Sequence, residues 1–220
     1  MKSLSLSKTD ASPLTILCLG AHSDDIEIGC GGTLLHLKRS GALLKIHWVV
    51  LSAVGRRGEE ALTGAELFTA GCEKQIVRKE FRDGFLPYCG AQVKEVFEEL
   101  KEQVDPDLIF THWQGDAHQD HRMVSELTWN TFRNHLILEY EIPKYDGDMG
   151  RPNAFIPLEE PAYMGKVDNL FKAFASQQSK PWFERETFLG LMRLRGMESN
   201  AASGYAEAFY TRKLLIDPIG

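Results

Sequence analysis

The succession of an apolar run, a helical segment and a second apolar run near the start of the chain is the feature that most constrains the fold. Residues 14–20, LTILCLG, are short, mostly apolar and closed by glycine, a pattern typical of a buried strand. Residues 31–41, GGTLLHLKRSG, favour a helix that ends at Gly41. Residues 43–52, LLKIHWVVLS, repeat the strand pattern. A strand–helix–strand unit of this kind joins parallel strands, so the sequence predicts a parallel sheet covered by helices.

The alternation of strand and helix patterns continues through most of the chain. Residues 91–104 place apolar side chains on one helical face, at positions 93, 96, 97, 100 and 104. The pattern also predicts strands at 74–81, 106–112, 136–142 and 207–216, and helices within 59–71, 121–135, 166–176 and 182–195. We therefore expect one α/β domain over residues 1–220, with a flexible arm at 1–13. It should be Rossmann-like, with a mostly parallel sheet and helices on both faces.

The composition argues against several classes of protein. A formal net charge of −6 argues against binding to nucleic acid or to an anionic membrane surface. The four cysteines form no CxxC pair, and Cys18 lies inside an apolar run, so a reducing compartment is expected. No apolar run is long enough to span a bilayer, and residues 1–13 lack the apolar core of a secretory signal. These observations predict a soluble, cytoplasmic protein.

A cluster of chemically active side chains follows the first predicted strand. His22, Asp24 and Asp25 stand within four residues, in the stretch AHSDD. Ligands of doubly wound sheets bind beyond the carboxyl ends of the strands, which is where this cluster falls. One histidine and one aspartate suit a divalent metal such as zinc, and the second aspartate suits a general base. Aspartate and serine before a helix are also ordinary caps and turn formers, and the pattern alone does not separate these interpretations.

Glycines follow the first cluster in the run GCGGT, residues 29–33. Gly29, Gly31 and Gly32 would let the chain turn sharply and bring the following helix close to the sheet. The run also resembles part of a dinucleotide-binding fingerprint. That fingerprint needs a third glycine where Leu34 stands, and the preceding acidic residues would repel a pyrophosphate. A nucleotide-binding Rossmann module is therefore the weakest of the functional interpretations.

A second cluster follows the predicted strand at 106–112. The stretch THWQGDAHQDHRMV contains His112, Asp116, His118, Asp120 and His121. One histidine of this cluster suits a metal ligand and another an acid or electrophile, while an aspartate suits the role of fixing an imidazole tautomer. His112 and Asp116 have no matched role here and fit a supporting position or loop structure. The first and fourth strands are neighbours in the common 3-2-1-4-5 order, so the two clusters should meet and bind one catalytic metal ion.

With these two clusters in this order, the sequence resembles the PIG-L/LmbE-like N-deacetylases, zinc hydrolases that act on N-acetylated amino sugars. AHSDDIEIGCGGTL and HQDH carry the resemblance, and GRRGEE, FRDGFLP and YAEAF between and after them are also typical. The likeness covers most of the chain in order. Ser23 stands where the family usually has proline, which removes a stiff turn and no chemistry.

The resemblance implies a role for each matching residue. His22, Asp25 and His121 would bind the zinc ion, and Asp24 would be the general base. His118 would polarise the acetyl carbonyl and assist the leaving amine, with Asp120 orienting it. Substrate contacts would come from Arg57 or its neighbour Arg56, and from Asp83.

The implied function is zinc-dependent removal of an N-acetyl group from an amino sugar or sugar conjugate, with release of acetate. One Zn²⁺ per chain is expected. Zinc lowers the pKa of its bound water to about 7, so hydroxide is available near neutral pH. Another divalent metal also fits two histidines and an aspartate. The partner would be a small N-acetylated sugar, with no nucleic acid and no membrane span, and a homo-oligomer is compatible with this account.

Two other functions remain open from the sequence. A metal-dependent hydrolase of another bond, such as another acyl amide or a phosphoester, would use similar residues; phosphoesterases often hold two metals about 3.5–4 Å apart. A non-catalytic sugar-binding relative would bind without cleaving. Outside the motifs, residues 143–153 form a polar loop that suits a substrate lid or a plain surface loop, and Trp113 suits sugar stacking or packing.

Overall fold

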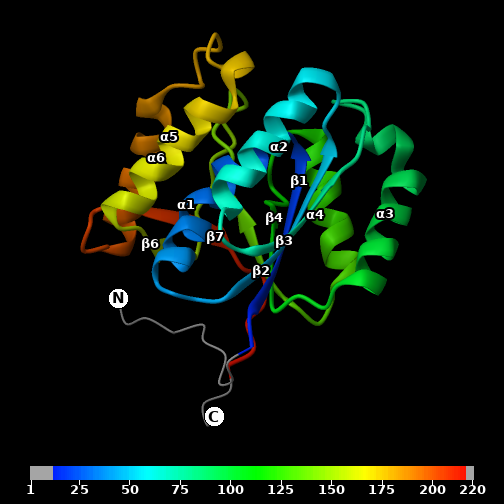
Figure 1. The fold of residues 1–220 in the computed structure, drawn as a ribbon, viewed down its shortest axis with the longest axis horizontal. Coiled ribbons are helices and arrows are strands. Elements are labelled where there is room, and N and C mark those ends of the chain that lie inside the picture. The colour runs from blue at the N-terminus through cyan, green and yellow to red at the C-terminus, as the bar shows by residue number, and fades with distance from the viewer. Residues whose placement is uncertain (1–11, 217–220) are drawn as a thin grey trace.

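The strands of the described residues form a seven-stranded sheet in the order β3-β2-β1-β4-β5-β7-β6. A computed structural model describes residues 12–216 (Figure 1). The strands are β1 Leu14–His22, β2 Leu44–Ser52, β3 Glu73–Arg78, β4 Leu108–His112, β5 Leu136–Tyr140, β6 Ala154–Pro157 and β7 Ala206–Tyr210. The first five run parallel, and β7 pairs antiparallel with both β5 and β6. The predicted 3-2-1-4-5 order of the parallel strands is confirmed.

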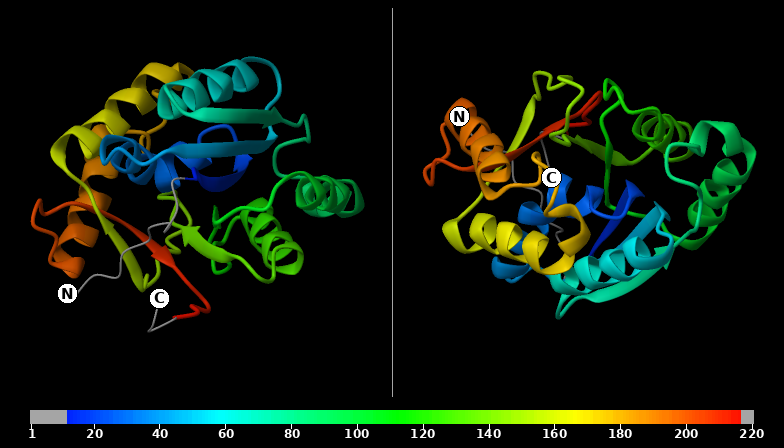
Figure 2. Two further views of the ribbon diagram at one scale, coloured as in Figure 1. Left: turned by 60° about the horizontal axis from the view of Figure 1, so that its bottom comes forward. Right: turned by 90° about the horizontal axis from the view of Figure 1, so that it is seen from above.

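Helices cover both faces of the sheet (Figure 2). They are α1 Asp25–Arg39, α2 Gly55–Thr69, α3 Gly90–Gln103, α4 Gln119–Thr131, α5 Glu160–Ala173 and α6 Arg185–Ser199, with short 3₁₀ turns at Leu86–Cys89 and Ala175–Gln177. Helices α3 and α4 pack on one face, and α1, α2 and α5 on the other, with α6 beside β7. The Rossmann-like class predicted from the sequence is confirmed. No helix among the described residues combines the length and the apolar character that a membrane crossing requires.

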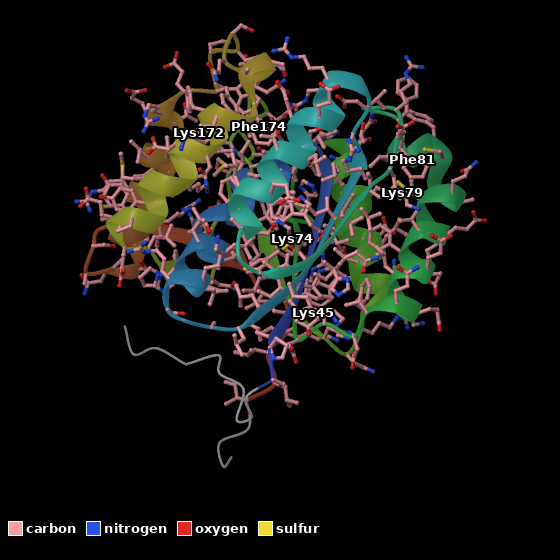
Figure 3. All side chains as sticks on the ribbon, in the orientation of Figure 1. Lys45, Lys74, Lys79, Phe81, Lys172 and Phe174 are labelled. Carbon is pink, nitrogen blue, oxygen red and sulfur yellow. The ribbon has the colours of Figure 1, made fainter. Side chains whose placement is uncertain are left out.

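Strand β1 is buried on both faces, which is why its sequence is nearly continuous in apolar residues. Ile16 and Cys18 contribute to the hydrophobic cluster on one side of the sheet, and Leu17 and Leu19 to the cluster on the other. Cys18 therefore packs as a small apolar side chain, in keeping with its place in an apolar run. At the far edge, β3 is protected by charge: Lys74 lies on the strand and Lys79 just after it (Figure 3), and edge charges of this kind oppose strand addition.

The first helix differs from the prediction. Helix α1 begins at Asp25, not at Gly31, so the glycines of GCGGT lie inside the helix and the expected sharp loop is wrong. The expected close approach is confirmed, since a Cβ on Gly29 would lie 2.3 Å from the Tyr140 ring and one on Gly31 would lie 2.4 Å from the Phe68 ring. Glycine is used here for contact between elements and not for a turn.

The chain after β5 contains an element that the sequence did not indicate. Residues Ala154–Pro157 form the edge strand β6 against β7. The strand has only four residues, three of them partly buried and the last an exposed proline, so neither length nor alternation marks it as a strand. The predicted arm at 1–13 falls almost entirely outside the described residues.

Candidate active site and metal centre

The metal ligands expected from the sequence meet at the carboxyl ends of β1 and β4. His22 ends β1, Asp25 opens α1, and His121 lies in the first turn of α4. His22 Nδ1 is 3.1 Å from His121 Nε2 and 3.3 Å from Asp25 Oδ2, and His121 Nε2 is 3.6 Å from Asp25 Oδ1. Two donors that each lie about 2.1 Å from a tetrahedral zinc ion are about 3.4 Å apart. The donor set and its spacing therefore fit a divalent cation such as zinc.

In both histidines, the ring nitrogen that faces away from the centre contacts a carboxylate. His121 Nδ1 lies 2.9 Å from Asp116 Oδ2, so Nε2 is free to face the centre. His22 Nε2 lies 3.2 Å from Asp120 Oδ2 and 3.1 Å from Asp83 Oδ1, which leaves Nδ1 facing the centre. Histidine ligands in metalloproteins commonly donate their second ring N–H to a carboxylate in this way, which fixes the ring and its tautomer.

Asp120 does not have the partner expected for it. Its carboxylate was predicted to orient His118, but it contacts His22 and accepts the N–H groups of Gly84 (2.8 Å) and Leu86 (3.2 Å). Its link to His118 is through the main chain, because the Asp120 N–H donates to His118 Nδ1 at 3.2 Å. His118 is the N-cap of α4, and an N-cap side chain normally accepts an amide of the first turn. Asp120 therefore orients His22 and the segment that carries Asp83.

His118 presents a hydrogen-bond donor beside the candidate metal centre. Because Nδ1 accepts a main-chain amide, the neutral ring carries its proton on Nε2. Its ring lies 4.8 Å from that of His22 and 4.6 Å from that of His121. Burial lowers the pKa of His118, and the neighbouring His121 and His22 lower it further. The imidazole is therefore neutral near pH 7 and can donate a hydrogen bond to a developing oxyanion.

Asp24 is buried next to Asp25, the expected ligand, and pairs with an arginine. Its Oδ1 accepts from Arg57 Nη2 at 2.7 Å, and it makes no capping bond to α1. Burial raises the pKa of Asp24, opposed by Arg57 and reinforced by Asp25. A buried carboxylate with a raised pKa suits proton transfer. The structure brings Asp24 into the cluster that the sequence predicted.

The two arginines named as substrate contacts have different surroundings. Arg57 is mostly buried and, besides Asp24, contacts Glu60 through Nη1 at 3.1 Å. Glu60 in turn accepts the N–H of Ser176 at 2.7 Å and its hydroxyl at 2.5 Å. Arg56 is 69% exposed and reaches Glu60 only at 3.6 Å. Arg57 thus belongs to a network that holds Asp24, a connection that the sequence did not indicate because Ser176 is 116 residues from Glu60.

His112, which had no matched role, is fully buried behind the centre. Its ring stacks on that of His121 with centroids 3.9 Å apart. Its Nε2 accepts the Ala21 N–H at 3.0 Å and lies 3.1 Å from Asp25 Oδ2. Three overlapping groups of described side chains have donor atoms within 4.8 Å of one another: His22, His118 and His121; Asp25, His112 and His121; and His22, Asp83 and Asp120. The second and third groups each share one histidine with the first, so all three lie around His22 and His121.

Asp116 is the clearest supporting residue, and its removal gives a first prediction. Asp116→Asn should weaken zinc binding by about 10–100-fold, because the His121 ring loses the carboxylate that orients it. Competition titration against a chelator measures this affinity. Asp105→Asn is the matched control, since Asp105 pairs with His135 at 3.0 Å and is fully exposed. Equal zinc affinity in the Asp116 and Asp105 variants would contradict the assignment.

A second prediction concerns pH. Burial lowers the pKa of His22, but Asp25, Asp120 and Asp83 raise it, and the net pKa lies well above the ordinary value of about 6.5. A metal must therefore displace a proton from His22 near neutral pH. Zinc affinity should rise with pH, by up to about tenfold per unit, from about pH 6.5 until the pH exceeds the raised pKa. Zinc titrations at a series of pH values test this, and an affinity that does not change with pH would refute it.

Comparison with known proteins places the chain in a family. A family model described as PIG-L: GlcNAc-PI de-N-acetylase matches residues 17–132, just over half of the chain. The protein YaiS of Escherichia coli (strain K12), named as an uncharacterized deacetylase, is 29% identical over 140 residues, which cover 58% of this chain and 74% of YaiS.

Solved structures share the fold. The conserved protein TT1542 from Thermus thermophilus is similar with a TM-score of 0.73 and 22% identity, over 94% of this chain and 99% of that one. N,N'-diacetylchitobiose deacetylase from Pyrococcus horikoshii is similar with a TM-score of 0.63 and 20% identity, over 90% of this chain and 83% of that one. The family match spans both clusters of the site, from β1 to the end of α4, and the chain belongs to the PIG-L (GlcNAc-PI de-N-acetylase) family.

Proposed function

We propose that this protein is a metal-dependent N-deacetylase that hydrolyses the acetamide of an N-acetylated amino sugar or sugar conjugate, with Zn²⁺ as its metal. The observation that carries the proposal is the convergence of His22, Asp25 and His121 with Asp24 and His118 at one point, in a member of the PIG-L family. Two histidines and one carboxylate, with further coordination positions left for water and substrate, are the stoichiometry of a catalytic centre. The whole chain serves this one reaction as a single domain.

Each residue of the cluster has a separate role in amide hydrolysis. A divalent cation held by His22, Asp25 and His121 supplies Lewis acidity toward the acyl oxygen and toward water. Asp24 accepts a proton from the attacking water, and Arg57 holds its carboxylate in place. His118 donates its Nε2–H to the acyl oxygen as negative charge develops there. The carbon–nitrogen bond breaks, the carbon–oxygen bond of acetate forms, and the leaving nitrogen takes the proton that Asp24 received from water.

Substrate recognition would fall to side chains at the edge of this cluster. Asp83 is 78% exposed although its carboxylate reaches His22, so it faces both the centre and the solvent. A carboxylate in that position suits a sugar hydroxyl. Arg57, and Arg56 outside it, would provide further donors. The amino-sugar class is proposed from the family description and from the chitobiose substrate named for the Pyrococcus enzyme.

A substrate panel with two readouts tests the proposal. Zinc-loaded protein is incubated with N-acetylglucosamine, diacetylchitobiose, glycoside conjugates of N-acetylglucosamine and simple phosphoesters, and acetate and phosphate are measured together with metal content. We expect acetate from at least one amino sugar, no phosphate, and one tightly bound ion per chain. Phosphate release with two bound ions would favour the phosphoesterase alternative, and sugar binding without any product would favour a non-catalytic relative.

A further inference from the structure

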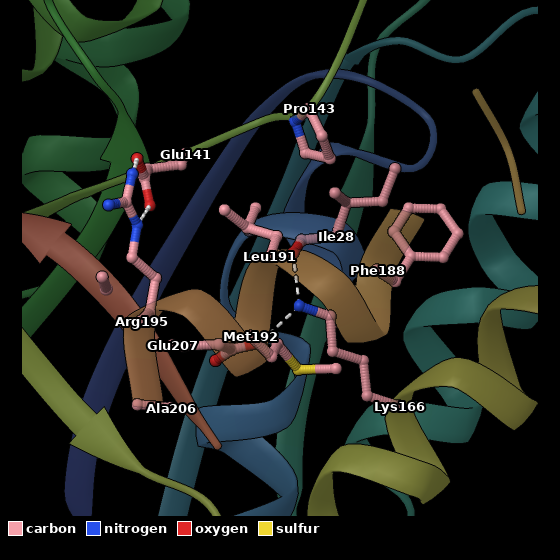
Figure 4. A pocket seen from close by; sticks show the side chains of 12 residues that line it. Ile28, Glu141, Pro143, Lys166, Phe188, Leu191, Met192, Arg195, Ala206 and Glu207 are labelled. Carbon is pink, nitrogen blue, oxygen red and sulfur yellow. Dashed lines mark hydrogen bonds and ion pairs between the residues drawn. The ribbon is translucent and has the colours of Figure 1, made fainter. Parts of the chain in front are cut away.

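A buried ion pair lies outside the residues assigned to catalysis. Lys166 on α5 and Glu207 on β7 place Nζ and Oε1 2.6 Å apart, and each side chain is less than 5% exposed. The pair lines a pocket together with Ile28 of α1 (Figure 4). Replacing a buried ion pair with apolar side chains is often neutral for stability. A role in holding neighbouring groups in one arrangement therefore explains this pair better than a gain in stability.

Both members of the pair bind the main chain of α1. Lys166 Nζ donates to the carbonyl oxygen of Ile28 at 2.5 Å. The Glu207 carboxylate accepts the N–H groups of Gly32 at 2.8 Å and Thr33 at 2.7 Å. In a regular α-helix the N–H of residue 32 donates to the carbonyl oxygen of residue 28. Here Glu207 accepts from that N–H, and Lys166 donates to that carbonyl oxygen. A Cβ on Gly32 would lie 2.8 Å from Glu207 Oε1, so glycine is what admits the carboxylate.

These contacts lead directly to the catalytic cluster. The N–H of Ile28 donates to the carbonyl oxygen of Asp24 at 3.0 Å, so the same peptide segment that Lys166 holds also closes the first turn of α1. That turn carries Asp24 and Asp25, and the Asp25 carboxylate accepts the N–H of His22 at 2.6 Å. Asp24 gives this turn no side-chain cap, and three glycines follow in the helix, so contacts from other elements stabilise its position.

We propose that Lys166 and Glu207 are positioning residues that fix the first turn of α1 and thereby set the Asp24 and Asp25 carboxylates against His22 and His121. The inference rests on the proposed function for its catalytic consequence, but its effect on metal binding does not depend on substrate. The late motif YAEAF, which carried part of the family resemblance without any role, includes Glu207. The proposal gives that glutamate a function.

The same pocket contains a matched control pair. Arg195 and Glu141 form a two-point ion pair, with Nε–Oε2 at 2.9 Å and Nη2–Oε1 at 2.6 Å, and both are buried. Arg195 also donates to Glu198 and to the Gly150 carbonyl oxygen. The hydrogen bonds of Glu141 and Arg195 within the described residues do not reach α1, so disrupting this pair should cost stability without moving the first turn of α1.

The test compares Glu207→Gln and the apolar double variant Lys166→Met/Glu207→Leu with Glu141→Gln. Zinc affinity is measured by chelator competition on substrate-free protein, kcat and KM by acetate release, and folding by thermal unfolding. We expect both α5–β7 variants to lose about 10–100-fold in zinc affinity and a similar factor in kcat, with KM little changed. Glu141→Gln should retain wild-type zinc affinity and kcat, even if its Tm falls as far as that of the α5–β7 variants.

Each outcome decides the proposal. A folded double variant with wild-type zinc affinity would overturn it, as would equal losses in Glu141→Gln. If neither α5–β7 variant folds, the pair serves stability alone and the proposal is wrong. Should wild-type protein bind zinc but release no acetate from any substrate, the proposed function fails, and the zinc affinities of the variants still test the positioning role.

Discussion

Asp24→Asn is expected to lower kcat for acetate release by about 10²–10⁴-fold, the range typical of a lost general base. Asparagine has nearly the same shape but cannot take a proton from water. Arg57 keeps Glu60 as a partner, so the substitution leaves no buried charge unpaired. Zinc affinity should change little, because the predicted ligands His22, Asp25 and His121 are untouched. Steady-state kinetics on zinc-loaded protein and chelator competition measure the two quantities.

The Asp24 prediction needs a control for the loss of its ion pair. Arg57→Gln breaks the same contact from the other side but keeps the carboxylate. If proton transfer by Asp24 is what matters, kcat should fall far less in Arg57→Gln, and most of the effect should appear in KM. A kcat loss in Arg57→Gln as large as that in Asp24→Asn would show that the pair, and not the base, is required.

His118→Ala is expected to lower kcat by about 10²–10³-fold, the cost of removing one donor to a developing oxyanion. The neutral ring offers its Nε2–H there, because Nδ1 is occupied by the Asp120 amide. His118→Gln should recover part of the loss, since its amide N–H₂ also donates a hydrogen bond, though from a different position. Kinetics of the two variants on the same substrate measure the difference.

The loss of the N-cap must be separated from the loss of chemistry in the His118 variants. Removing a cap costs about 1 kcal/mol of stability, which thermal unfolding detects. Assays well below the unfolding temperature exclude that contribution. Zinc affinity should remain close to wild type, because His118 is not among the three predicted ligands. A large loss of bound zinc in His118→Ala would instead assign His118 to the metal, in the group that it forms with His22 and His121.

Local patterns in the sequence were sufficient to predict the parallel core. The runs that become β1 and β2 are apolar because both faces of those strands are buried, and this signal needs no distant partner. The order of the five parallel strands was expected from the arrangement that is common in doubly wound sheets. The edge strand β6 was missed because it depends on pairing with β7, about fifty residues later, and not on its own pattern.

Helix α1 shows where local signals failed. Its first two turns contain Asp25 and several glycines, which are weak helix formers, so the predicted start was at Gly31. Tertiary contacts override that weakness, since Tyr140, Phe68 and Glu207 all approach the glycines closely. None of these contacts can be inferred from the sequence near α1.

The site was predictable in its members but not in its connections. The clusters around His22 and His121 identified the residues that meet, because each follows a predicted strand. The pairs of side chains could not be assigned from the sequence. Asp120 contacts His22, 98 residues away, and Asp116 is the carboxylate that contacts His121. Lys166 and Glu207 were missed for the same reason, because Glu207 lies 175 residues from Gly32. Such contacts depend on the packed fold.

The most direct test of the account is a zinc titration of acetate release. Metal-free protein is mixed with an N-acetylated amino sugar that the panel has identified, zinc is added in steps, and acetate is followed by NMR. The account predicts no release without metal, a rate that rises in proportion to added zinc, and a break at one equivalent per chain. Release that does not depend on metal, or a break at two equivalents, would contradict a single centre formed by His22, Asp25 and His121.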